Sequence, residues 1–131
     1  MGVKERLRQH MEQAVRAVLE PGEQVRAMAF GTVPPRWWGY AILGPLAITF
    51  LEWPHYVAVT DRRVILLKPS LTGRETQLVW TGPRGAVSVL EFRLRLKTRI
   101  RLRRADGSEV LLNFARSWRD EAEAIRRALA A

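Results

Sequence analysis

The stretch from Glu91 to Arg104 constrains the fold more than any other part of the chain. It reads E-F-R-L-R-L-K-T-R-I-R-L-R-R, with basic and apolar side chains in alternation and Thr98 as the one interruption. A period of two is typical of a β-strand with one buried and one solvent-facing side. A helix with this sequence would carry charge on every side. The stretch therefore predicts β-structure, either one long strand or two strands joined near Lys97 and Thr98.

The basic positions of this stretch form a candidate polyanion-binding face. They are Arg93, Arg95, Lys97, Arg99, Arg101 and Arg103. With Arg104 and Glu91 included, the stretch contributes a net charge of +6 to the formal +9 of the whole chain. Such a balance attracts polyanions, so anionic membranes and nucleic acid are both admissible partners. A solvated outer face that carries charge for solubility is the competing interpretation.

A chain of 131 residues fits a single domain, here residues 1–131, and can bury a substantial core. The chain has no cysteine, which excludes disulfides. Its first ten residues are charged from Lys4 onward and lack the apolar region of a secretory signal. We therefore expect a cytoplasmic protein, which a membrane-binding function would place at the inner face of the membrane as a peripheral protein.

Periodicity divides the chain into three parts: an N-terminal helix over residues 1–20, β-structure over 21–115 and a C-terminal helix over 116–131. The first helix has apolar side chains three and four residues apart. These are Val3, Leu7, Met11, Ala14, Val15, Val18 and Leu19. About seven strands follow, with a tight turn at 60–63 and a hairpin at Asp106-Gly107. Ser117 and Asp120 resemble a capping box, which predicts that the last helix begins there.

The segment from Trp37 to Leu51 contains no charged residue and is bounded by Arg36 and Glu52. It is shorter than the roughly 20 apolar residues of a membrane-spanning helix, which favours a core strand or hairpin. A membrane-dipping hairpin and a subunit interface are the alternatives. Amphipathic rings and cationic tips favour the headgroup zone of a membrane. The candidate membrane or interface anchor is therefore Arg36, Trp37, Trp38 and Tyr40.

The order of these elements resembles a pleckstrin-homology-like domain, an antiparallel barrel or sandwich of about seven strands capped by an amphipathic C-terminal helix. The segment Tyr56 to Leu67, Y-V-A-V-T-D-R-R-V-I-L-L, is preceded by P-G-E-Q-V at 21–25 and followed by the late D-G hairpin. These features resemble the bacterial pleckstrin-homology-like families, with the T-D-R-R turn as the most specific part. The resemblance covers about residues 21–130, leaves the N-terminal helix as an addition, and implies a binding or assembly module.

The sequence offers little for catalysis. It has two separated histidines, His10 and His55, no cysteine and no phosphate-binding loop or nucleophile elbow. Most of its carboxylates fall in predicted turns beside arginine, where capping and surface ion pairs explain them. We therefore expect a protein that is not an enzyme, with no catalytic residue, metal site, cofactor or small-molecule substrate.

A binding function is therefore the remaining interpretation, and several classes of partner are compatible with the sequence. The first hypothesis is that the basic strand faces an anionic lipid surface or an acidic protein partner. The second is sequence-independent binding of nucleic acid. We rank it lower because proteins that bind single strands place aromatic rings on the exposed face, whereas the alternation puts Phe92 on the buried face of the strand. The third is a self-assembling homo-oligomer that uses a strand edge or the segment 37–51 as its interface.

Overall fold

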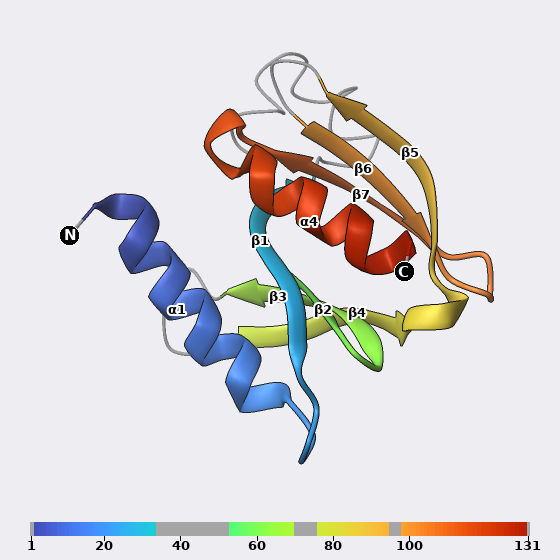
Figure 1. The fold of residues 1–131 in the computed structure, drawn as a ribbon, viewed down its shortest axis with the longest axis horizontal. Coiled ribbons are helices and arrows are strands. Elements are labelled where there is room, and N and C mark those ends of the chain that lie inside the picture. The colour runs from blue at the N-terminus through green and yellow to red at the C-terminus, as the bar shows by residue number, and fades with distance from the viewer. Residues whose placement is uncertain (1, 34–52, 70–75, 95–97, 131) are drawn as a thin grey trace, which may run out of the picture.

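The computed structural model describes residues 2–33, 53–69, 76–94 and 98–130. It contains an antiparallel sheet with one α-helix before it and one after it (Figure 1). The helices are α1 (Val3–Val18) and α4 (Arg119–Ala130), and two short 3-10 helices are η2 (Arg84–Ala86) and η3 (Arg116–Trp118). The strands are β1 (Val25–Val33), β2 (Trp53–Thr60), β3 (Arg63–Pro69), β4 (Thr76–Pro83), β5 (Ser88–Leu94), β6 (Thr98–Arg103) and β7 (Glu109–Phe114). The prediction of a mostly β fold with terminal helices is confirmed.

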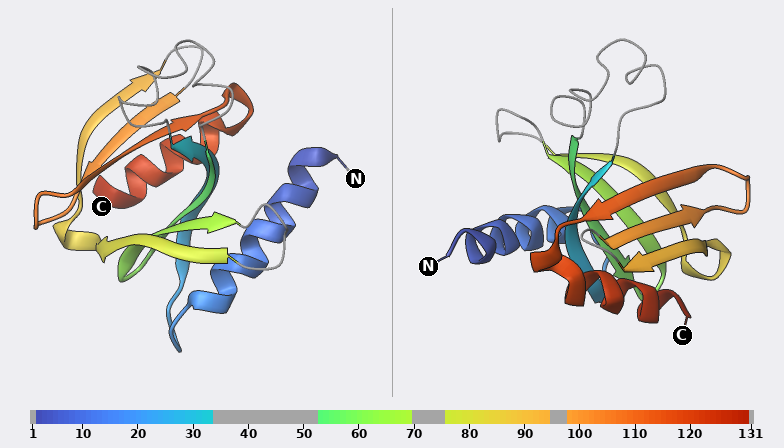
Figure 2. Two further views of the ribbon diagram at one scale, coloured as in Figure 1. Left: turned by 180° about the vertical axis from the view of Figure 1, so that it is seen from behind. Right: turned by 90° about the horizontal axis from the view of Figure 1, so that it is seen from above.

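The seven strands form one sheet in the order β4-β3-β2-β1-β7-β6-β5, and every pairing is antiparallel. The two ends of this order, β4 and β5, are the edges, so the described strands do not close into a barrel, which was one of the two predicted arrangements. The chain passes from one edge to the other through η2. Figure 2 shows the two wings of the sheet, β2–β4 and β5–β7, on either side of β1.

Each helix contributes apolar side chains to the core. Met11 and Val15 of α1 are buried, whereas Val3, assigned from sequence to the same apolar face, is 82% exposed at the start of the helix. Ala122 and Ile125 of α4 are fully buried in the cluster that the strands line. Helix α4 packs against β1, β2, β5 and β6, so it covers the inner side where the two wings meet.

The two turns predicted from sequence have the expected geometry, and the predicted helix start does not. Gly107 has a φ of 90°, a left-handed conformation that glycine adopts without steric cost, in the turn between β6 and β7. The turn at 60–63 joins β2 to β3. Ser117 does not cap α4, because it lies within η3 and the α-helix begins at Arg119. The backbone carbonyl of Ser117 instead accepts a hydrogen bond of 2.7 Å from Lys4 Nζ.

Ion pairs connect helix α1 to the beginning of α4. Glu121 Oε1 lies 2.9 Å from Lys4 Nζ and 2.8 Å from Arg8 Nη2. Lys4 also lies 4.8 Å from the centroid of the buried Trp118 ring, within the range of a cation–π contact. Burial alone would raise the pKa of Glu121, but the hydrogen bond from Lys4 and the charges of Lys4 and Arg8 lower it. The N-terminal helix is therefore held by specific contacts to the C-terminal one.

Candidate functional site

The basic stretch folds back on itself as two strands, β5 and β6. Glu91 is the register partner of Arg101, and Arg93 is the register partner of Arg99. This settles the choice between one strand and two: the arginines form a patch two strands wide. We define the arginine face as Arg93, Arg99, Arg101 and Arg103. Two members of the candidate polyanion-binding set, Arg95 and Lys97, lie outside the described residues.

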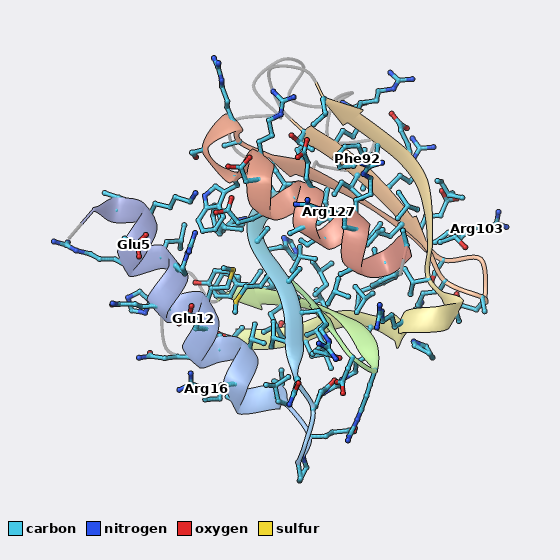
Figure 3. The ribbon with its side chains drawn as sticks, in the orientation of Figure 1. Glu5, Glu12, Arg16, Phe92, Arg103 and Arg127 are labelled. Atoms are coloured by element: carbon cyan, nitrogen blue, oxygen red, sulfur yellow. The ribbon has the colours of Figure 1, made fainter. Side chains whose placement is uncertain are left out.

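Alternation along β6 separates the arginine face from the core. Ile100 and Leu102 are fully buried, whereas Arg99 and Arg103, which flank them along the strand, are exposed. Arg101 lies between them, with a side chain that is 43% exposed. Phe92 of β5 pairs with Ile100 and has Arg126 of α4 4.6 Å from its ring centroid. Figure 3 shows Phe92 between β5 and α4, and Arg103 pointing away from the body of the protein. Phe92, the aromatic residue that is described in this hairpin, therefore lies on the side of the sheet that faces α4.

One carboxylate lies within the arginine face. Glu91 Oε1 lies 2.8 Å from Arg93 Nε, and Glu91 Oε2 lies 3.7 Å from Arg101 Nη2. Arg99 Nε donates to Asn113 Oδ1 at 3.4 Å, a neutral partner on β7. Glu91 therefore offsets part of the positive charge, and the face keeps an excess of arginine.

The cross-strand pair of Arg93 and Arg99 lies at the end of the hairpin nearest the 95–97 connection. Like charges that face each other directly across an antiparallel pair are destabilising. The side chain of Arg93 is 57% exposed, so solvent screens this repulsion in part. A bound anion would relieve it further.

Arg104 ends the basic stretch but is not part of the arginine face. Its Nη1 donates to the Thr81 carbonyl at 2.9 Å, and its Nε donates to Ser108 Oγ at 2.6 Å. Its guanidinium lies 5.1 Å from the ring centroid of Trp80. Because Thr81 belongs to β4, this side chain bridges the two wings of the sheet, which are not joined there by strand pairing. The sequence pattern alone assigned Arg104 to the same charged run as its neighbours.

Two members of the arginine face, Arg93 and Arg99, lie on one transverse row with the strands that flank the segment 34–52. Pro54 of β2 pairs with Thr32 of β1, Thr32 with Asn113 of β7, Asn113 with Arg99, and Arg99 with Arg93. Strand β1 ends at Val33, one residue beyond Thr32, so the strand ends that flank the segment 34–52 lie beside the row that carries Arg93 and Arg99. The candidate anchor residues, Arg36, Trp37, Trp38 and Tyr40, lie outside the described residues.

A second arrangement of arginine and carboxylate occurs between the turn at 60–63 and the chain before β1. Glu23, whose side chain is fully buried, accepts hydrogen bonds from Arg63 Nε at 3.0 Å, Arg63 Nη2 at 3.1 Å and Thr60 Oγ1 at 2.6 Å. Arg63 Nη2 also donates to the Val18 carbonyl at the end of α1 at 2.7 Å. The P-G-E and T-D-R-R segments therefore meet in space, which spacing along the chain could not predict.

These hydrogen bonds define the charge state of the buried carboxylate. Hydrogen bonds from Arg63, Thr60 and the backbone of Glu20, together with the charge of Arg63, lower the pKa of Glu23 from 4.5 to about 2, although burial acts in the opposite direction. Removing one partner of a buried, hydrogen-bonded ion pair is strongly destabilising, because the other charge is left buried without compensation. The Glu23 carboxylate is also closed to ligands, since its side chain is fully buried. We therefore assign Glu23 and Arg63 a structural role.

Among the described residues, no group of three or more histidine, aspartate or glutamate side chains is placed to hold a metal ion. No helix in this part of the chain is long and apolar enough to cross a membrane. Comparisons with protein-family models, curated proteins and solved structures find no match to this chain. The arginine face is the arrangement that points most directly to a ligand.

Proposed function

We propose that this chain is a non-catalytic binding module of the pleckstrin-homology-like type that docks on an anionic membrane surface through its arginine face. The family assignment is supported by the order of elements, by the antiparallel seven-stranded sheet and by the C-terminal helix on its inner side. The sequence motifs quoted for the resemblance encode turns and a buried ion pair, so the binding role depends on the arginine face.

The observation that carries the proposal is the pairing of Arg93 with Arg99. Among the described residues, these two exposed arginines at opposing register positions share no carboxylate, because the ion pairs of Glu91 reach Arg93 and Arg101. Lipid phosphates or carboxylates between the two guanidinium groups would turn a repulsive pair into an attractive arrangement. Each basic residue near an anionic membrane contributes about 1 kcal/mol, so four arginines are enough for measurable binding even after the offset by Glu91.

The segment 34–52 supports a membrane over a protein surface. The strands that flank it end beside the row of Arg93 and Arg99, and its sequence contains an uncharged run that begins with Trp37 and Trp38. Tryptophan beside arginine favours the headgroup region of a bilayer. Nucleic acid is disfavoured because Phe92 lies on the α4 side, where it is not available for base stacking together with the arginines.

The proposal is tested by flotation of the purified protein with vesicles of phosphatidylcholine alone and with vesicles that contain phosphatidylserine, at low and physiological salt. We expect binding only to the anionic vesicles, with part of it retained at physiological salt. The variant Arg99→Glu with Arg103→Glu should lose this binding. Its matched control is Arg6→Glu with Arg16→Glu, which makes the same change in net charge at exposed positions of α1.

Each outcome has a distinct meaning. Loss of binding in both double variants would show that net charge, and not the arginine face, attracts the protein to vesicles. Absence of wild-type binding to either kind of vesicle would overturn the membrane proposal and would direct attention to an acidic protein partner. Equal binding to both kinds of vesicle would indicate that insertion of apolar side chains into the bilayer, and not charge, provides the affinity.

A further inference from the structure

Among the described strands, β5 forms one edge of the sheet, and apolar side chains lie beside it. Leu90 and Leu94 are 46% and 42% exposed, although they belong to a strand whose neighbour β6 is partly core. A pocket of about 380 Å³ lies along this edge, between β5 and the last turn of α4. Its lining includes Leu90, Phe92, Arg126 and Leu129. An edge strand with an adjoining apolar pocket is suited to the addition of another strand.

The charges on this edge indicate which strand fits. Natural proteins protect an edge with charged side chains that repel a second copy. In the segment L-E-F-R-L, residues 90–94, the two charges are opposite and lie symmetrically about Phe92. If two copies pair in antiparallel fashion about Phe92, Glu91 of each copy faces Arg93 of the other, and Leu90 faces Leu94.

Neighbouring registers lose this match. A shift by two residues in one direction places Glu91 opposite Glu91, and a shift in the other direction places Arg93 opposite Arg93. A shift by one residue places Glu91 opposite Phe92, which mixes the charged and apolar faces of the strand. Opposite charges and apolar pairs across a ladder are each stabilising, whereas like charges are destabilising. The edge is therefore complementary to itself in one register.

We propose that a second copy of this chain docks on β5, in an antiparallel pair with its two-fold axis at Phe92. Leu94 of the second copy then lies beside Leu90 at the pocket. The β-bulge between Val89 and Glu91 lies at Leu90, so Leu90 is at one end of the pairing segment. The two arginine faces lie on the same side of the continuous sheet, so one dimer presents both faces in the same direction. The opposite edge, β4, carries no charged side chain from Thr76 to Pro83 and has no comparable feature to select a register.

The experiment uses the full chain without lipid, so it is independent of membrane binding. We expect light scattering to give the mass of a dimer for the wild-type protein. Glu91→Lys and Arg93→Glu should each weaken self-association about tenfold or more, since each introduces repulsion at two symmetry-related positions. An equimolar mixture of these two variants should associate again, because every charge then faces its opposite. Val79→Lys on β4 should leave the dimer unchanged.

Register is tested by cross-linking at exposed positions, because the chain has no native cysteine. Leu90→Cys mixed with Leu94→Cys should form a disulfide-linked dimer under mild oxidation, since register partners lie about 5 Å apart. Leu90→Cys alone should not, because its two copies would be four residues apart along the strand, about 13 Å. A wild-type monomer, a dimer lost in Val79→Lys, or cross-linking of Leu90→Cys alone in place of the mixture would each overturn the proposal. Circular dichroism of each variant separates loss of association from loss of fold.

Discussion

Two regions of this protein combine arginine with glutamate, and they differ in what those side chains can do. Around Glu23, one fully buried carboxylate accepts two hydrogen bonds from Arg63 and one from Thr60. On the arginine face, Glu91 lies near Arg93 and Arg101, whose side chains are 57% and 43% exposed. Burial makes the first pair part of the fold, whereas exposure leaves the second group available to an external anion. Residue type alone does not distinguish these roles.

The sharpest test of this comparison removes the carboxylate from each region. Glu23→Gln should lower the free energy of unfolding by about 3 kcal/mol, because it leaves the guanidinium of Arg63 without its counter-charge at a mostly buried position. The matched change Glu91→Gln should cost less than about 1 kcal/mol, since its partners are exposed. Urea denaturation at neutral pH measures both values. Equal losses in the two variants would contradict the distinction.

The pH dependence of stability should follow Glu23. Its pKa is lowered to about 2 in the folded protein, so the carboxylate stabilises the fold above pH 4.5. This contribution is lost as the pH falls from about 4.5 towards 2, and the difference in pKa corresponds to roughly 3 kcal/mol. Denaturation curves of the wild type and of Glu23→Gln across this range should therefore converge at low pH. A constant difference between them would show that protonation of Glu23 does not contribute.

A conservative change should separate the two kinds of arginine. Arg63 uses Nε and Nη2 on one carboxylate and Nη2 on the Val18 carbonyl, a forked geometry that lysine cannot reproduce. Arg63→Lys should lower the free energy of unfolding by about 1 to 2 kcal/mol. Arg99→Lys should change it by less than about 0.5 kcal/mol and should retain vesicle binding. Thermal unfolding with vesicle flotation tests both expectations.

The smallest expected effect concerns the like-charge pair. Arg99→Gln removes the repulsion with Arg93 and should raise the free energy of unfolding by a few tenths of a kcal/mol. It should weaken binding to anionic vesicles at the same time. A change that stabilises the protein while it lowers affinity is expected when charge is retained for a ligand. A destabilised Arg99→Gln protein would instead indicate that the hydrogen bond to Asn113 is structural.

The sequence by itself determined the local features. The period-two alternation identified which side of β6 is buried, and the turn at Asp106-Gly107 followed from the φ that glycine allows. The two terminal helices followed from apolar spacing, although Val3 lies outside the buried face and the last helix begins later than its capping signal suggested. These features depend on neighbours along the chain, which the sequence displays directly.

Only the tertiary structure decided which distant residues meet. Alternation is the same in one strand or two, so the fold-back that places Arg93 beside Arg99 required the observed register. Glu23 and Arg63 are forty positions apart, and Arg104 reaches Thr81 across the open side of the sheet. Backbone geometry defines a local pattern, but the pairing of strands determines whether an arginine is buried against a carboxylate or left exposed beside another arginine.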